Sequence, residues 1–153
     1  FSQTTFFIFC IYFNFVYCKT LKIVFAMSEK IKYTLEYNIK TSTKVLYERL
    51  STPSGLSEWF AEDVNINKNI YTFIWDGSQE HAELITKKAE KYVKFRWVDD
   101  IPKYYFEFKI DIDDLTGGLA LNITDFDFEE DLEEAKEMWD YHVNDLKHAL
   151  GII

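Results

Sequence analysis

The sequence is poor in cysteine, proline and glycine. Among its 153 residues are two cysteines, two prolines and five glycines, and both cysteines, Cys10 and Cys18, fall within the first 26 positions. From Met27 onward the chain therefore offers no disulfide, no thiol nucleophile and no thiolate ligand for a metal. A domain without cysteine is typical of a reducing compartment, so we expect a cytoplasmic protein.

An excess of positive charge is also missing. The chain has 17 basic and 26 acidic residues, and because two lysines lie in the first 26 positions, the remainder carries 15 basic residues against 26 acids, a charge of −11. Nucleic-acid binding needs Lys and Arg to neutralise phosphates, so we expect no nucleic-acid partner. Three scattered histidines and the lack of a glycine-rich phosphate loop lead us to expect neither a metal site nor a cofactor.

The first 26 residues differ in composition from the rest and contain no acid. Their apolar run, residues 6–18, is interrupted by Asn14 and is shorter than the roughly 20 residues of a membrane-spanning helix. Its lysines follow the apolar run, whereas a signal peptide has its positive charge before it. We expect residues 1–26 to be translated upstream sequence outside the fold, with an anchor or export signal as the alternative. Residues 27–153 are then one domain that is not embedded in a membrane.

Alternation of apolar and polar residues dominates the middle of the chain. The segment "KIKYTLEYNI" (residues 30–39) has an apolar side chain at every second position, as in a half-buried strand. The same period recurs in residues 69–84, 91–100, 103–114 and 115–126. Asp76-Gly77 and Gly117-Gly118 are typical of hairpin turns. Since no helix-length segment separates these strands, we predict an antiparallel sheet of about six strands.

Helical patterns flank the predicted sheet. Residues 41–50 and a second short segment from Pro53 to Trp59 follow the first strand. A long helix is predicted to begin at an Asp127 N-cap, with Glu130 completing a capping box. Its apolar stripe has alternating steps of three and four: Leu132, Ala135, Trp139, His142, Leu146, Ala149 and Ile153. Met138, Val143 and Leu150 widen this stripe. Because an antiparallel sheet must have its apolar face covered, we predict an α+β fold with this helix on the sheet.

The segment "KVLYERLSTPSGLSEWFAEDV" (residues 44–64), the order of elements and the terminal helix together resemble the START-like, or SRPBCC, superfamily. The resemblance covers residues 29–151. It is nearest to proteins similar to the C-terminal domain of the activator of the heat-shock-protein-90 ATPase, or to uncharacterised bacterial START-like proteins. Ser51-Thr52-Pro53 departs from the Thr-Asp-Pro of that branch. The resemblance implies a helix-grip fold, in which a curved sheet holds the C-terminal helix.

Aromatic residues make up 18% of the chain and share the strand faces that would meet this helix. For Trp59-Phe60 we expect one ring to seal the core and the other to line a cavity mouth; alternatively, both rings only pack. The rings as a group either line a cavity or fill it. The predicted lining consists of Trp59, Phe60, Phe73, Trp75, Phe95, Trp97, Phe106, Phe108, Met138, Trp139 and His142.

Three functions compete. The first is non-enzymatic binding of a hydrophobic or amphipathic small molecule, which an empty pocket of several hundred Å³ would favour. The second is a protein-interaction module, similar to the chaperone-activator domain, whose acidic surface meets a basic partner. A filled interior with an exposed apolar patch would favour it. The third is an aromatase/cyclase-like enzyme with His142 as base, which needs another ionisable group beside that ring. Otherwise His142 is a core histidine hydrogen-bonded to a strand carbonyl or a buried tyrosine, and we predict no catalytic residue.

Overall fold

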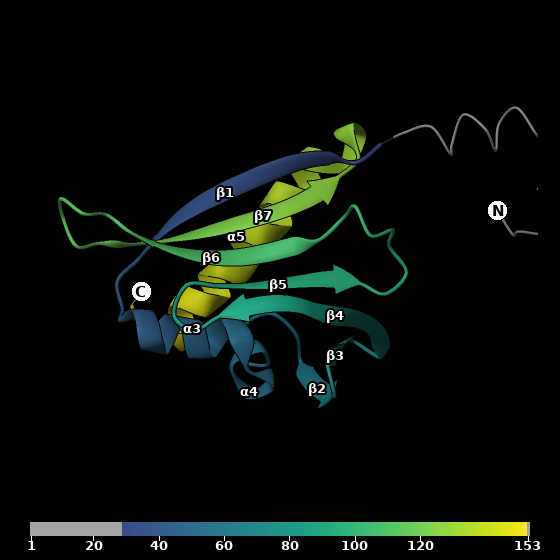
Figure 1. Cartoon of the computed structure of the whole chain (residues 1–153), viewed down its shortest axis with the longest axis horizontal. Coiled ribbons are helices and arrows are strands. Elements are labelled where there is room, and N and C mark those ends of the chain that lie inside the picture. Colours follow the sequence, from purple (N-terminus) through teal and green to yellow (C-terminus); the bar gives the residue numbers. More distant parts are fainter. Residues whose placement is uncertain (1–28, 153) are drawn as a thin grey trace, which may run out of the picture.

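The structure is a computed structural model that describes residues 29–152. One strand precedes two short helices, six further strands, a 3-10 turn and a long helix (Figure 1). The predictions for residues 1–26 and for Ile153 lie outside the described residues. The elements are β1 (Ile31–Ile39), α3 (Thr43–Ser51), α4 (Pro53–Leu56), β2 (Asp63–Asn67), β3 (Ile70–Trp75), β4 (Ser78–Lys88), β5 (Tyr92–Trp97), β6 (Phe106–Ile112), β7 (Leu119–Asp127), η1 (Glu129–Asp131) and α5 (Leu132–Ala149).

The seven strands form one antiparallel sheet in the order β1-β7-β6-β5-β4-β3-β2. The predicted α+β class, the antiparallel pairing and the two helices after the first strand are confirmed. Asp76 and Gly77 join β3 to β4 with positive φ angles of 38° and 78°, as the hairpin sequence predicted. The one strand without a sequence signal is β2, in which only Val64 is buried, so its alternation is weak.

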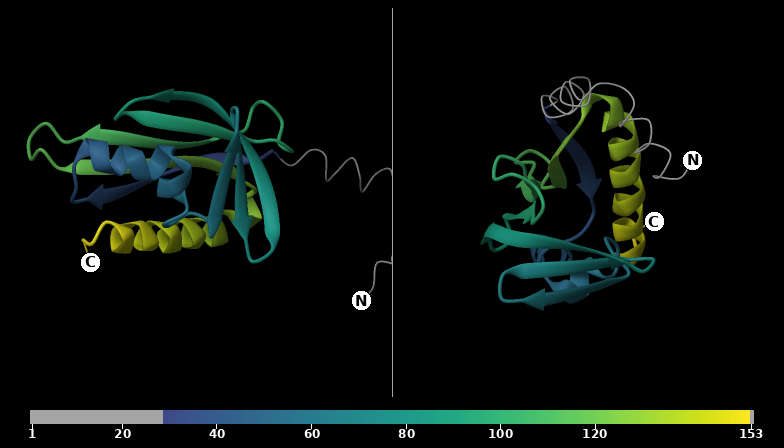
Figure 2. Two further views of the ribbon diagram at one scale, coloured as in Figure 1. Left: turned by 90° about the horizontal axis from the view of Figure 1, so that it is seen from below. Right: turned by 90° about the vertical axis from the view of Figure 1, so that its right-hand side faces the viewer.

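The sheet curves around α5, which lies across its open side (Figure 2). The helix buries Ala135, Trp139, Val143 and Leu146. The predicted helix-grip arrangement is therefore present. The buried stripe is narrower than the sequence predicted, because Met138 remains 51% exposed at its edge.

Two predicted helix boundaries are wrong. Asp127 is not an N-cap: it is the last residue of β7, lies opposite Ile31 of β1, and accepts a hydrogen bond from the Phe128 N–H at Oδ1 (2.9 Å). Pairing with β1 keeps this residue extended, so η1 intervenes before α5 starts at Leu132. The second short helix ends at Leu56, which places Trp59 and Phe60 in the turns after α4.

Gly55 permits the close packing of α4 against the end of α3. The Thr52 hydroxyl accepts a hydrogen bond from the Gly55 N–H at 3.0 Å and donates to the Glu48 carbonyl at 2.7 Å. A Cβ on Gly55 would overlap that same carbonyl oxygen and would lie 2.7 Å from the Arg49 Cα. Both are backbone atoms, which cannot turn aside as a flexible side chain can.

We therefore expect Gly55→Ala to lower the free energy of unfolding by about 1–3 kcal/mol, as overpacking usually does. Urea denaturation followed by circular dichroism measures this change. The matched control is Gly118→Ala, because a Cβ there meets only the Thr116 side chain, at 3.2 Å. Equal losses in the two variants would contradict the proposed close approach.

Candidate functional site

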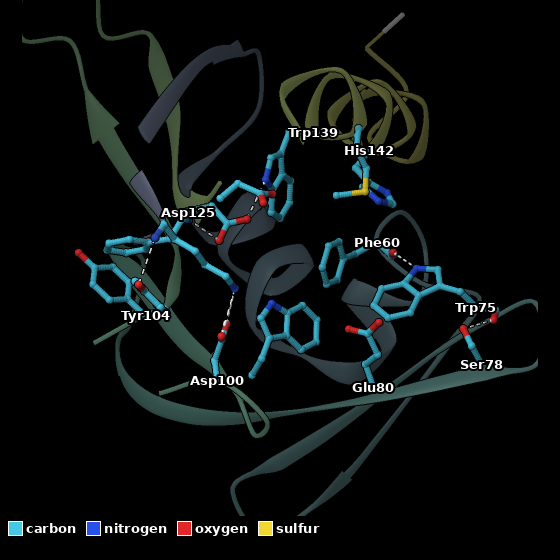
Figure 3. Close-up of a pocket in the computed structure, with 15 residues that line it drawn as sticks. Phe60, Trp75, Ser78, Glu80, Asp100, Tyr104, Asp125, Trp139 and His142 are labelled. Carbon is cyan, nitrogen blue, oxygen red and sulfur yellow. Dashed lines mark hydrogen bonds and ion pairs between the residues drawn. The ribbon is translucent and has the colours of Figure 1, made fainter. Parts of the chain in front are cut away.

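A cavity of about 440 Å³ lies between the sheet and α5 (Figure 3). Segments far apart in the sequence line it: the turn after α4, the ends of β3, β5 and β7, the start of β4, the β5–β6 connection, and one face of α5. The interior is therefore not filled completely by its rings. That outcome is the one that favours a small-molecule site over a solid core.

Six of the eleven predicted residues line the cavity: Phe60, Trp75, Trp97, Met138, Trp139 and His142. The other five do not line it and pack in the core, each at most 4% exposed: Trp59, Phe73, Phe95, Phe106 and Phe108. Alternation identified the correct face of each strand. It does not tell which side chains on that face reach the cavity and which are buried below its wall. Whether the six bind a ligand stays a prediction.

The adjacent rings of Trp59 and Phe60 have different surroundings. Trp59 donates its indole N–H to the Arg49 carbonyl at 2.9 Å and packs against Phe108, with centroids 5.5 Å apart. Phe60 stacks parallel to Trp139, with centroids 5.6 Å apart, and forms part of the cavity wall. Both rings are buried, so Phe60 packs and lines the cavity at once.

Trp75 completes this wall from the end of β3. Its indole N–H donates to the Phe60 carbonyl at 2.7 Å, and the Phe60 ring meets Trp75 edge-on at 5.5 Å. On the next wall, Trp97 lies 6.3 Å from Trp75, centroid to centroid. Because the Trp75 N–H already has a protein partner, its polar edge is satisfied without a ligand.

Asp125 is a lining residue that the sequence reasoning missed. It continues the inward-facing series Leu121 and Ile123 on β7. Its Oδ1 accepts from the Phe126 N–H at 2.8 Å, and its Oδ2 accepts from the Trp139 indole N–H at 3.1 Å. Burial raises the pKa of Asp125 to about 6, against the two hydrogen bonds and the charge of Lys30, which lower it.

Tyr33 lies directly opposite Asp125 in the β1–β7 pair. Its hydroxyl is buried and has no hydrogen-bond partner among residues 29–152. Burial, and then the charge of Asp125, raise the pKa of Tyr33 above its usual range. Counting two residues beyond Ile123 places Asp125 on the apolar face of β7, which is the sequence signal for this carboxyl, but its contact with Trp139 is not visible in the sequence.

Lys30 and Asp100 form an ion pair at the same end of the cavity. The Lys30 ammonium lies 3.0 and 3.1 Å from the two carboxylate oxygens of Asp100. The backbone N–H of Lys30 donates to the Tyr104 hydroxyl at 3.1 Å, and its ammonium is 5.2 Å from the centre of that ring. This cation is therefore already engaged by the protein.

His142 lines the cavity from α5, with Nδ1 3.4 Å from the Trp59 carbonyl and its ring 5.3 Å from Phe60. Burial lowers the pKa of His142, opposed by the carbonyl contact and by Asp145, so the neutral ring is favoured. Over the described residues, its hydrogen-bond partner is this backbone carbonyl and no ionisable side chain. A carbonyl partner agrees with the core-histidine alternative, but this carbonyl belongs to the turn after α4 and not to a strand. The ring has no acid–base partner among the described residues.

Residues 29–152 contain neither a metal-binding cluster nor a membrane-spanning helix. Within that part of the chain, no group of three or more His, Cys, Asp or Glu side chains is arranged to hold a metal ion. None of the helices there combines the length and the apolar character needed to cross a membrane.

Comparisons with known proteins agree with this architecture. A family model described as a START-like superfamily domain matches residues 27–152. No curated protein matches the chain. A Bacteroides fragilis protein with an NMR solution structure is 36% identical, with a TM-score of 0.58; the match covers 80% of this chain and 92% of that one.

Two other solved structures are similar in fold alone. The Aha1 dimer from Colwellia psychrerythraea is 17% identical with a TM-score of 0.66, and the match covers 78% of this chain and 96% of that one. DynU16, a protein in the dynemicin biosynthetic locus, is 14% identical with a TM-score of 0.67, and the match covers 78% of this chain and 47% of that one. The family match extends over all of the described fold, with a helix gripped by a curved antiparallel sheet, and so this chain belongs to the START-like superfamily.

Proposed function

We propose that the protein binds a hydrophobic or amphipathic small molecule in the cavity between the sheet and α5, and that it does so without catalysis. The cavity itself is the observation that carries this proposal. Its volume of about 440 Å³ falls in the range of small-molecule sites, and its walls are mainly rings, with acidic side chains from β4, β7 and the β5–β6 connection among them. START-like folds commonly bind hydrophobic ligands.

The wall is held in place before any ligand arrives. Trp75 is hydrogen-bonded to the Phe60 carbonyl and Trp139 to Asp125, and Phe60 lies between the two indoles. A preorganised pocket loses little conformational entropy on binding, which favours affinity. These contacts support recognition of an apolar body by shape.

Met138→Arg tests this proposal with a neutral probe, N-phenylnaphthylamine, whose fluorescence rises in apolar surroundings. Met138 lines the cavity but is 51% exposed, so the fold should tolerate the change. A charged side chain across the opening should weaken probe binding by about tenfold or more, equal to about 1.4 kcal/mol.

The matched control is Tyr141→Arg. Tyr141 is on the same helix, is 65% exposed and does not line the cavity, so the variant adds the same charge without obstructing the opening. Unchanged binding to this control is expected. Failure of the wild-type protein to bind the probe, or equal losses in both variants, would contradict the proposal. Native mass spectrometry of protein from its own host should also show a retained small molecule.

A protein-interaction role is the second candidate. The exposed Met138 and Tyr141 side chains on α5, in a chain of charge −9, are compatible with a basic partner that has an apolar contact. The fold is also similar to that of Aha1. The open cavity makes this candidate the weaker one, since interaction alone does not require it.

The absence of cysteine after residue 26 supports a cytoplasmic location for either role.

An aromatase/cyclase-like activity has less support. His142 faces the cavity, but it contacts a backbone carbonyl and has a lowered pKa. A general base works with a partner that orients it or shares its proton, and the described residues place no ionisable side chain in hydrogen-bond contact with this ring.

A further inference from the structure

The charges that line the cavity are unbalanced. Glu80, Asp100, Asp125 and Asp127 contribute four carboxylates, and Lys30 is the one Lys or Arg among the lining residues of the described chain. With His142 neutral, four negative charges and one positive charge leave −3. Within residues 29–152 the hydrogen bonds of the Lys30 ammonium go to Asp100, so the lysine forms no ion pair with the other three acids, although its charge lowers the pKa of Asp125.

A second hollow adjoins the cavity and extends this negative region. The two share Glu80, Trp97 and Asp100, and the second adds Asp99. Neither Lys nor Arg is among its lining residues in the described chain. A concave surface lined by one sign of charge focuses the electrostatic field and attracts ligands of the opposite sign.

The rest of the cavity suits the apolar part of such a ligand. Phe60, Trp97 and Trp139 present rings to it, and ring faces attract cations in addition to packing against apolar groups. The protein already uses this attraction, since the Lys30 ammonium lies 5.2 Å from the centre of the Tyr104 ring. The aromatic walls and the carboxylates thus favour the same class of molecule, a cation attached to an apolar body.

Asp125 retains unused acceptor capacity at the buried end. A carboxylate offers about four acceptor positions, and Asp125 uses two, for the Phe126 and Trp139 N–H groups. Tyr33, whose hydroxyl has no hydrogen-bond partner among residues 29–152, lies directly opposite Asp125 in the β1–β7 pair. A ligand carboxylate or phosphate would lose its hydration here and lie beside charges of its own sign, which disfavours binding. An ammonium group, in contrast, can donate hydrogen bonds to the Asp125 carboxylate.

We infer that the cavity selects a protonated amine carried on an apolar body, with the ammonium N–H donating to Asp125 and the body lying against Phe60 and Trp97. This inference rests on the proposed binding function and names its ligand class. Anionic amphiphiles are then the class that the site rejects.

The test compares three probes that share one apolar body: naphthylethylamine, naphthylethanol and naphthylacetate. Isothermal titration calorimetry at neutral pH should show the amine binding at least about tenfold more tightly than the alcohol, as one charge-assisted hydrogen bond can provide. The acetate should bind most weakly. Equal or tighter binding of the alcohol or the acetate overturns the inference and leaves the proposed binding function standing.

Asp125→Asn identifies the residue responsible. This variant should lose about tenfold in affinity for the amine and keep its affinity for the alcohol within about twofold. Asp131→Asn removes the same charge from an exposed position outside the cavity and should change neither. Equal amine affinity in both variants would overturn the role of Asp125. The probe comparison on the wild-type protein decides the ligand class even if Asp125→Asn does not fold.

Two further outcomes separate the proposals. If none of the three probes binds but neutral N-phenylnaphthylamine does, the amine inference fails and the binding function stands; if that neutral probe also fails, both fall. The trimethylated ammonium analogue keeps the charge but has no N–H. It should bind more weakly than the amine, and equal affinity would overturn the hydrogen bond to Asp125.

Discussion

Replacing Trp139 with alanine is expected to lower the free energy of unfolding by about 3–5 kcal/mol, the usual loss for a large buried ring. The side chain is 3% exposed. It stacks on Phe60 at 5.6 Å and meets Phe108 edge-on at 5.7 Å. Removing it leaves a void between α5 and the sheet and also takes a hydrogen-bond donor from Asp125. Urea denaturation monitored by circular dichroism measures the loss.

Met138→Ala is the control, because the neighbouring position is 51% exposed and should change stability by about 0.5 kcal/mol or less. Trp139→Phe separates packing from hydrogen bonding, since it keeps a ring and loses the indole N–H. A near-neutral Trp139→Ala variant would mean that α5 turns another face to the sheet. The cavity between them would then be wrong as well.

We expect the Asp125→Asn variant to lack a pH-dependent loss of stability that ionisation of Asp125 causes in the wild-type protein. The pKa of Asp125 is about 6 in the folded protein against an ordinary value of 3.8, so the folded state binds this proton more tightly than the unfolded state does. Stability therefore falls as pH rises from about 4 to about 6, and the loss persists above that range. At 1.36 kcal/mol per pH unit, the full loss is about 3 kcal/mol.

Asparagine does not titrate, so the free energy of unfolding of the variant, relative to that of the wild type, should rise by about 3 kcal/mol between about pH 4 and about pH 8. The amide has a single acceptor oxygen for the Phe126 and Trp139 N–H groups, so the variant also loses a hydrogen bond. That loss of stability is the same at every pH, and comparing the two proteins across pH therefore isolates the effect of the titrating carboxyl. Urea titrations at several pH values measure the difference. Asp131→Asn, at an exposed position, should follow the wild-type curve, and a flat difference for Asp125→Asn would contradict the buried carboxyl.

Local patterns predicted most of the fold. Alternation in β1, β3, β5 and β6 and the spacing of apolar residues along α5 were correct, because each reports which face of one element is buried. Local patterns failed where a distant segment decided the outcome. Asp127 resembles a helix cap in sequence, but its pairing with Ile31 holds it in a strand.

The candidate site depended more strongly on tertiary structure. Phe73 and Trp75 alternate in the same phase of β3, yet Phe73 is completely buried and Trp75, at the end of the strand, reaches the cavity. Asp125 shares its face with Leu121 and Ile123, and only the approach of Trp139 from α5 makes it a hydrogen-bonded cavity residue. The period of one strand does not tell how far along it the cavity lies, or which side chains from other elements meet its residues.

The sequence by itself determined the antiparallel sheet, the covering helix, the membership of the START-like superfamily and the acidic charge. The sheet, the helix and the charge follow from composition and from periodicity within single elements, which a linear chain displays directly. The superfamily followed from a resemblance carried by residues 44–64, the order of elements and the terminal helix, and the family match confirms it. Only the tertiary structure decided that the rings leave a cavity of about 440 Å³ and that acids from β4, β7 and the β5–β6 connection surround it. Those features depend on how separate elements meet, because a void and its charge belong to the space between them.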